Sequence, residues 1–177
     1  PDTELSLADI KKIFYPEFVS QLERVNFNGN LGDFALARDA REIVEFFVEQ
    51  NIKVDINTNG SLRSPGWWAG LANPLVSIGW AIDGLADTHS LYRQDTDWHR
   101  VIDNARSFID AGGRATWRFI PFEHNRHQQA QCEQLSRDLG FWRFENIWDG
   151  RDRGPVYTRS GDFSHSIGEP YEGTPAR

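Results

Sequence analysis

The stretch DINTNG, Asp55–Gly60, decides the fold, because an apolar and β-branched run that begins at Lys53 ends abruptly there on an Asn-Thr-Asn-Gly turn. Such an ending is typical of a buried parallel strand, whose carboxyl end carries polar side chains and a glycine where a ligand can sit. Residues 53–58 are therefore predicted to form a strand. Asn57 and Asn59 follow at the end from which parallel sheets bind ligands.

Three further runs end in the same way, and a fourth has the period and apolar content of a strand. They are VNFNGNLGD at Val25–Asp33, VSIGWAIDG at Val76–Gly84, ATWRFIPFEHN at Ala115–Asn125 and the run Trp142–Trp148. Helical patterns with apolar residues at 3,4 spacing separate them. Strands that alternate with helices through short loops pair in parallel by right-handed crossovers. We expect an α/β fold, either a partial parallel β/α barrel of the TIM-barrel type or, as the alternative, a doubly wound sheet.

Capping signals place the helices. Ser6 with Asp9 forms a capping box before an apolar stripe, and Asp39 with Glu42 opens a second helix. Asn125 is predicted to cap a later helix, which Gly140 ends. Residues 1–149 are expected to form the barrel domain, and residues 150–177, rich in glycine and proline, an irregular tail.

Composition sets outer limits on function. The 177 residues include 39% hydrophobic residues and seven tryptophans, enough for one sizeable core, and carry a formal charge of -7. The acidic balance argues against nucleic acid as a partner. No apolar run is long enough to span a membrane and no secretory signal is recognised, so a cytoplasmic location is expected. The single cysteine, Cys132, excludes an internal disulfide and a metal site made only of this chain's cysteines.

The strand ends also carry groups that suit a polar ligand. Gly29 and Gly32 let backbone amides approach closely, and Asp33 can accept hydrogen bonds from an ammonium or hydroxyl group. Asn57 and Asn59 supply uncharged donors and acceptors. Arg93, in the connection after the third strand, offers a fork for a carboxylate. Each of these residues also has an ordinary structural explanation, such as a turn, a cap or a surface charge.

Metal ligands are not evident in the pattern. His124 and His127 lie at i,i+3, but no third ligand stands at a motif spacing and Cys132 falls on an apolar stripe, so a structural role is favoured. The chain lacks G-x-S-x-G, G-x-G-x-x-G and phosphate-binding Gly-Lys-Ser/Thr motifs.

Taken in order over Leu5–Glu145, the strand ends read NFNGNLGD, INTNGS, IGWAIDGLADTHSLYR and FIPFEHNRHQ. This set resembles the core of the radical S-adenosylmethionine (SAM) superfamily, in the branch that often carries a cysteine-rich C-terminal extension. The resemblance implies a partial barrel with a four-iron four-sulfur cluster and SAM at the carboxyl ends of its strands. In that family, cleaved SAM gives a 5'-deoxyadenosyl radical that takes a hydrogen atom from a substrate, often a peptide.

The resemblance also implies roles for residues. The loop of Asn28, Gly29, Asn30, Gly32 and Asp33 corresponds to the one that meets the SAM amino group. Asn57 and Asn59 lie where a strand approaches SAM. The remaining matches are the IDG aspartate, the arginine after it and the asparagine that follows the next strand: Asp83, Arg93 and Asn125.

Two departures from the family pattern shape the functional hypothesis. The Cys-x3-Cys-x2-Cys cluster loop and the first barrel strand are absent, and Ala81 stands where a serine is often found. We interpret the chain as the central fragment of a radical SAM enzyme, inactive by itself, with neither SAM nor cluster expected on it. Without the first strand, the edge Val25–Gly29 is expected to form homo-oligomers.

Two other function classes remain open. One is a cluster-free binding module for a peptide or small molecule. The other is an unrelated barrel enzyme that uses Asp33 and Asp83 as acid and base.

Overall fold

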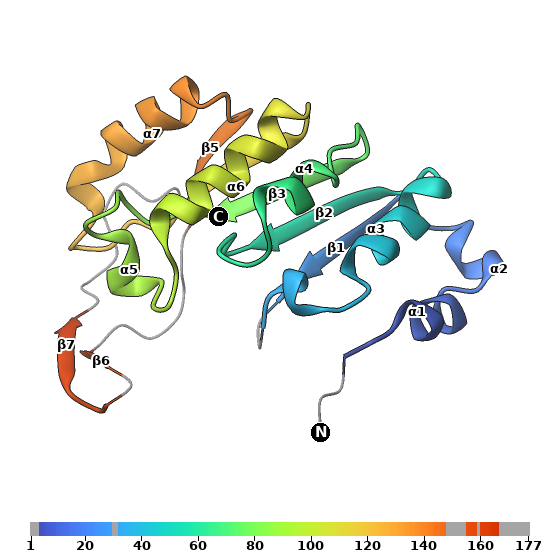
Figure 1. Ribbon diagram of the computed structural model, residues 1–177, viewed down its shortest axis with the longest axis horizontal. Helices are drawn as coiled ribbons and strands as arrows, with labels where there is room; N and C mark the ends of the chain where they lie inside the picture. The colour runs from blue at the N-terminus through green and yellow to red at the C-terminus, as the bar shows by residue number, and fades with distance from the viewer. Residues whose placement is uncertain (1–3, 30–31, 148–154, 159, 167–177) are drawn as a thin grey trace.

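The computed structural model describes residues 4–29, 32–147, 155–158 and 160–166 (Figure 1). Its centre is a five-stranded sheet whose strands neighbour one another in chain order. They are β1 Arg24–Asn28, β2 Lys53–Thr58, β3 Val76–Ala81, β4 Arg114–Phe119 and β5 Arg143–Asn146. All four neighbouring pairs are parallel. The predicted strands are present, although β3 ends before Asp83 and β4 before Phe122, and Trp148 lies outside the described residues.

The strand order decides between the two folds that the sequence left open. In a doubly wound sheet the strand order reverses at a switch point, whereas here it runs in one direction from β1 to β5. Right-handed crossovers in one direction leave their helices on the same side of a sheet. Figure 1 accordingly shows helices along one side of the strands. The fold is an incomplete, unclosed parallel β/α barrel, as predicted.

The helices follow the predicted pattern. They are α1 Leu7–Ile13, α2 Pro16–Val19, η1 Phe34–Leu36, α3 Ala40–Glu49, α4 Pro65–Ala69, α5 His89–Tyr92, α6 Trp98–Asp110, η2 Arg126–Gln128 and α7 Gln129–Asp138. The capping box of α1 is confirmed, because the Asp9 amide donates to Ser6 Oγ at 3.2 Å and the Ser6 amide to Asp9 Oδ2 at 3.2 Å. Gly112 and Gly140 follow α6 and α7 with φ of 88° and 82°, a conformation that favours glycine.

The side-chain cap predicted for α3 is wrong. Asp39 precedes α3, but its side chain makes no capping hydrogen bond to that helix. The carboxylate instead accepts a hydrogen bond from the backbone amide of Leu7, at 2.9 Å. That amide lies in the first turn of α1, where amides have no partner inside the helix. Asp39 thus accepts a hydrogen bond from an amide of α1 and not from an amide of its own helix, and this contact ties α1 to α3.

The core lies between the sheet and the helices. In β3 the residues Val76, Ile78 and Trp80 are fully buried and alternate with half-buried ones. Trp68 of α4 packs against Trp80 with 4.8 Å between ring centroids and donates its indole N–H to the Leu62 carbonyl at 2.8 Å. Its neighbour Trp67 stays partly exposed, so one of the two adjacent tryptophans fills the core.

Part of the predicted irregular tail has regular structure. β6 Pro155–Tyr157 and β7 Phe163–Ser166 form an antiparallel hairpin. The division of the chain at residue 149 stays a prediction. Within the part of the chain that the structure describes, no helix has the length and apolar character needed to cross a membrane.

Candidate functional site

The face of the sheet away from the helices carries two cavities. One lies at the carboxyl ends of the strands and has a volume of about 520 Å³; we call it the carboxyl-end cavity. The other, the amino-end groove, has a volume of about 500 Å³ and lies over the first residues of the strands, among them Arg24, Lys53, Arg114 and Arg143. Both volumes are within the range of small-molecule sites, about 300–1,000 Å³.

The carboxyl-end cavity brings together most of the predicted site residues. Seven of the ten line it: Asn28, Gly29, Gly32, Asp33, Asn57, Asn59 and Arg93. Asp83 and Asn125 are fully buried and do not line it, and Asn30 lies outside the described residues. The cavity is completed by residues that the sequence did not single out as ligand contacts: Thr58, Gly79, Ala81, Arg118, Ile120 and Ile147.

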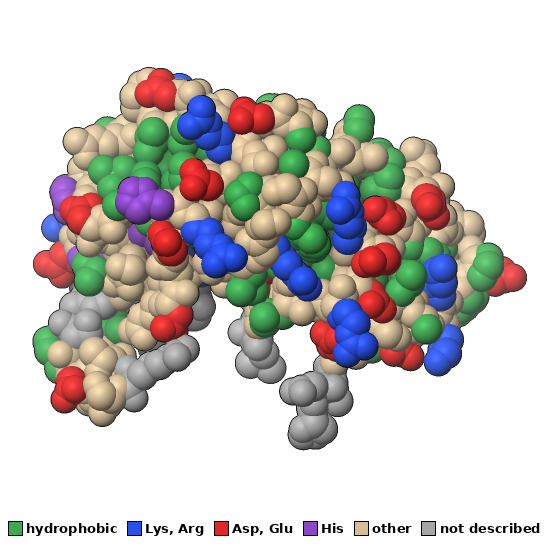
Figure 2. All heavy atoms as spheres, viewed as in Figure 1, with side chains coloured by type: hydrophobic (Ala, Val, Ile, Leu, Met, Phe, Trp, Pro, Cys, Tyr) green, Lys and Arg blue, Asp and Glu red, His purple; other side chains and the backbone are tan. Residues whose placement is uncertain are grey.

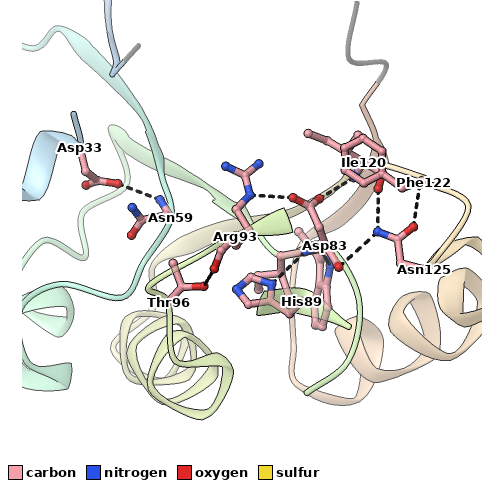
Figure 3. A network of polar contacts seen from close by, with 11 residues as sticks. Asp33, Asn59, Asp83, His89, Arg93, Thr96, Ile120, Phe122 and Asn125 are labelled. Carbon is pink, nitrogen blue, oxygen red and sulfur yellow. Dashed lines mark hydrogen bonds and ion pairs between the residues drawn. The ribbon is translucent and has the colours of Figure 1, made fainter. Parts of the chain in front are cut away.

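Asp33 organises one wall of this cavity. Its carboxylate accepts hydrogen bonds from the amide of Ala35 at 2.9 Å, the hydroxyl of Thr58 at 2.9 Å and the amide of Asn59 at 2.8 Å. Figure 3 shows the contact with Asn59. The loop after β1 is therefore fastened to the end of β2. Asp33 does accept hydrogen bonds from an amide and a hydroxyl, but these donors belong to the chain itself.

Glycine is required at Gly29 by the packing of the loop itself, while the predicted approach of its amides to a ligand stays a prediction. A Cβ atom added at Gly29 would lie 2.1 Å from the carbonyl oxygen of Gly32, closer than real Cβ contacts. Any side chain at Gly29 would thus force the two backbone segments apart.

The buried Asp83 forms an ion pair with the half-buried Arg93 in the cavity wall. The Asp83 carboxylate is fully buried, and it accepts the Arg93 Nε–H at 2.6 Å and the Ile120 amide at 2.6 Å. Figure 3 shows the terminal nitrogens of Arg93 pointing away from this carboxylate. Arg93 is therefore only partly committed, and its terminal nitrogens can bind a ligand carboxylate from within the cavity wall.

The same geometry contradicts the acid and base pair. Asp33 lines the cavity, whereas Asp83 does not and is engaged by Arg93. A general acid and a general base must both reach one substrate. The structure does not bring these two carboxylates to one cavity.

His89 holds Asp83 from the other side. Its Nδ1 accepts a hydrogen bond from the Asp83 backbone amide at 3.1 Å, so the imidazole is neutral at that atom. Burial and, as a smaller cause, the positive charge of Arg93 together lower the pKa of His89 to about 4. The sequence showed His89 only as part of a connection, because its partner stands at the end of the preceding strand.

Asn125 stands at the N-cap position of η2, which leads into α7, but its side chain makes no capping hydrogen bond. Its side-chain amide donates to the carbonyl oxygens of Asp83 at 3.2 Å and Ile120 at 3.0 Å, and accepts from the Phe122 amide at 2.7 Å. These backbone groups lie beyond the ends of β3 and β4, where the sheet no longer pairs them. Asn125 therefore joins the two strand ends and does not face the cavity.

A polar bridge separates the cavity from the groove. Arg118 of β4 donates to the side-chain oxygen of Asn57 on β2, across Gly79 of β3. A Cβ atom at Gly79 would lie 2.6 Å from that oxygen and 2.7 Å from Arg118 Cδ, so glycine is required for the bridge. The alternating pattern of Arg114, Thr116 and Arg118 in RATWRF could have revealed that Arg118 faces this side.

The chain does not fit an iron-sulfur cluster. The sequence has a single cysteine, Cys132, which lies buried on α7. Burial raises the pKa of its thiol to about 12, with smaller contributions from the negative charges of Asp83 and Asp87. Cluster ligands are thiolates, of which a family cluster takes several. Among the described residues, no group of three His, Cys, Asp or Glu could hold a metal ion.

The open parallel β/α barrel of this chain is similar to the fold of several solved structures. Streptococcus suis SuiB bound to S-adenosylmethionine is 16% identical over 80% of this chain, with a TM-score of 0.63. Native anSMEcpe with bound AdoMet and the Cp18Cys peptide is 17% identical over 84% of this chain, with a TM-score of 0.58. Archaeal TYW1 is 12% identical over 66% of it, with a TM-score of 0.52. At these identities the likeness shows the fold.

The chain spans only part of each of these proteins: 32% of SuiB, 44% of anSMEcpe and 39% of TYW1. No family model matches the sequence, and no curated protein does. The chain therefore shares with these proteins the fold of an open parallel β/α barrel.

Proposed function

We propose that the chain, as the central part of a radical SAM enzyme, binds S-adenosylmethionine in its carboxyl-end cavity, although the sequence alone predicted neither SAM nor a cluster on it. The observation that carries this proposal is the convergence of Asn28, Asn57, Asn59 and the Arg93 guanidinium on one cavity of about 520 Å³ in a barrel of this fold. SuiB and anSMEcpe, which share the fold, were solved with this molecule bound.

The chemical groups of the cavity suit the parts of SAM. The terminal nitrogens of Arg93 bind a carboxylate, and the uncharged amides of Asn57 and Asn59 bind polar groups without adding charge. The glycines leave backbone close to the ligand, as in other sites where a cofactor lies against the chain. Ala81 cannot donate a hydrogen bond, so the ligand contact that a serine supplies at the matching family position is missing.

The chemistry of the cluster is not assigned to these residues. When bound in a radical SAM enzyme, the cluster supplies the electron that cleaves SAM. The single buried thiol of this chain cannot hold such a cluster. The function proposed for these 177 residues is binding and orientation of SAM, and hydrogen-atom abstraction from a peptide is proposed only for a protein that also provides the cluster ligands.

A pair of matched variants tests the cavity. Asn28 ends edge strand β1 and lines the cavity, whereas Asn146 ends edge strand β5 and does not. Both side chains are exposed, so each change to alanine removes the same group at little structural cost. Isothermal titration with SAM should show an affinity about tenfold weaker for Asn28→Ala, the loss of roughly one hydrogen bond to a charged ligand, and unchanged for Asn146→Ala. Equal SAM affinities for both variants would show that SAM does not bind in the carboxyl-end cavity.

The cluster-free binding module is the second candidate, and the buried Cys132 is compatible with both candidates. The two candidates differ in their response to a synthetic segment that carries a Cys-x3-Cys-x2-Cys loop and a reconstituted cluster. For a radical SAM core, this segment should raise the SAM affinity by at least about a hundredfold, because the cluster chelates the amino and carboxylate groups. For a cluster-free module, the affinity should not change.

Homo-oligomers through β1 are proposed as well. β1 pairs only with β2 in the described part of the sheet, so its other edge presents unpaired backbone groups. Light scattering at high concentration should show a dimer or larger species, and a monomer at all concentrations would contradict this proposal.

A further inference from the structure

The amino-end groove has a charge opposite to that of the chain. Five cationic side chains line it, Arg24, Lys53, Arg114, Arg118 and Arg143, with two carboxylates, Asp55 and Glu145. Five positive charges against two negative ones leave an excess of three, whereas the whole chain carries -7. A basic groove of this kind attracts anionic partners to one place on an acidic protein.

The placement of these cations costs stability in the free protein. Arg24 and Lys53 begin β1 and β2 and stand directly opposite each other in the sheet register. Like charges opposite each other in neighbouring strands repel. Asp55 offsets this repulsion through an ion pair with Arg24, but Lys53 has no carboxylate partner among the described residues. The repulsion between Arg24 and Lys53 is explained if a bound ligand supplies a negative charge to Lys53.

An exposed tryptophan extends the groove on the other side. Trp142 is 52% exposed and lies between two arginines. The guanidinium carbons of Arg114 and Arg143 lie 3.6 Å and 4.3 Å from its ring centroid. These contacts hold both arginines against the ring faces, and the exposed part of the indole edge is left open to an apolar side chain. The groove therefore combines fixed positive charge with one aromatic surface.

The helix-covered face differs from this groove. Figure 2 shows that face, on which acidic and basic side chains are interspersed. The excess of basic groups in the groove is thus not a property of the whole surface.

We propose that the amino-end groove binds an acidic peptide segment in extended conformation, with an aromatic or aliphatic side chain of the peptide against Trp142. The cations come from β1, β2, β4 and β5, and four strand spacings of about 4.8 Å span about 19 Å. One phosphate or carboxylate cannot reach all of them, whereas an extended peptide of about six residues can.

An RNA strand fits the groove less well. Asp55 and Glu145 stand among the cations, and the charge of -7 on the chain opposes a backbone with one negative charge per nucleotide. A peptide can place its carboxylates at Lys53 and Arg114 and neutral residues elsewhere. The proposal does not depend on SAM, because Lys53, Arg114 and Trp142 line the groove and not the carboxyl-end cavity.

Fluorescence anisotropy with three labelled probes tests this proposal. The probes are a peptide of about six residues made of Glu and Phe, the same peptide with Gln for every Glu, and single-stranded RNA of equal length. The wild-type chain should bind the acidic peptide at least about tenfold more tightly than the Gln peptide, and less tightly as salt is raised. Equal binding of the two peptides would overturn the proposal. Tighter binding of RNA than of the acidic peptide would show that the partner is a nucleic acid and not a peptide.

A matched pair of double variants locates the binding. Arg114→Gln with Arg143→Gln removes two charges from the groove, and Arg106→Gln with Arg137→Gln removes two from the exposed faces of α6 and α7. The first pair should weaken peptide binding about tenfold or more and the second less than about twofold. Equal losses of affinity in the two double variants would show that the peptide responds to the net charge of the chain and does not bind in this groove. The comparison of the two peptides on the wild-type chain stands even if a variant does not fold.

Discussion

Replacing His89 by asparagine should flatten the dependence of stability on pH between about 4 and 6.5. The His89 imidazole is buried and accepts a hydrogen bond from the Asp83 amide through Nδ1. Protonation would remove that acceptor and place a second positive charge near Arg93. Asparagine keeps an acceptor oxygen close to the position of Nδ1 and does not titrate.

The pKa of His89 gives the size of the effect. It falls from 6.5 to about 4 in the folded chain, so between these values the unfolded state binds more protons than the folded state. Stability from this group is complete above pH 6.5 and is lost as the pH falls toward 4. At 1.36 kcal/mol for each pH unit, the total loss is about 3 kcal/mol, of which about 2 kcal/mol is lost by pH 5.

Urea unfolding at pH 7 and pH 5 measures this loss. Other groups titrate over the same range, so the informative quantity is the difference between the wild-type chain and His89→Asn. The matched control is His99→Asn, which changes an exposed imidazole on α6 and should keep the wild-type dependence on pH. If His89→Asn loses as much free energy of unfolding at pH 5 as the wild type, His89 is not a neutral buried acceptor.

Three further changes follow from the structure. Gly79→Ala should destabilise the chain by about 1–3 kcal/mol and weaken SAM binding, because its Cβ would collide with the bridge between Asn57 and Arg118. Denaturation and SAM titration measure the two effects. The control Ser77→Ala, on the same face of β3, should change neither stability nor SAM binding. Cys132 should not react with a thiol reagent at pH 8 in the native chain and should react after unfolding, since burial raises its pKa to about 12; rapid native labelling would contradict that burial. Trp68→Ala should cost about 3–5 kcal/mol in denaturant unfolding, as expected for a fully buried tryptophan, and a cost below 1 kcal/mol would show that the core tolerates its loss.

The sheet was predictable because its signals are local. Each strand combines an apolar run with a polar, glycine-containing end, and sequential right-handed crossovers leave few ways to arrange such units. The cavity followed for the same reason: Asn28, Asn57 and Asn59 end or follow neighbouring strands, so parallel pairing alone brings them together. The hairpin of β6 and β7 was missed because strands of three and four residues carry too little pattern.

Contacts between distant elements were not predictable. Asp39 and Asn125 have the residue types of helix caps, but each bonds backbone groups of another element. The pair of Asp83 and Arg93, with His89 beneath it, depends on how the connection after β3 folds back on the strand end. Side-chain type sets what such groups can bond, and tertiary structure sets which partner they find.

The most direct test of SAM binding is residue-specific, by amide chemical shifts of the isotope-labelled chain during titration with SAM. We predict saturable shifts at Asn28, Asn59 and Gly79, at the carboxyl ends of β1 to β3, and none at Arg24 and Lys53, at the amino ends of the same sheet. Shifts confined to the amino-end groove, or none up to about 5 mM SAM, would contradict the proposal that this barrel binds SAM at its carboxyl ends.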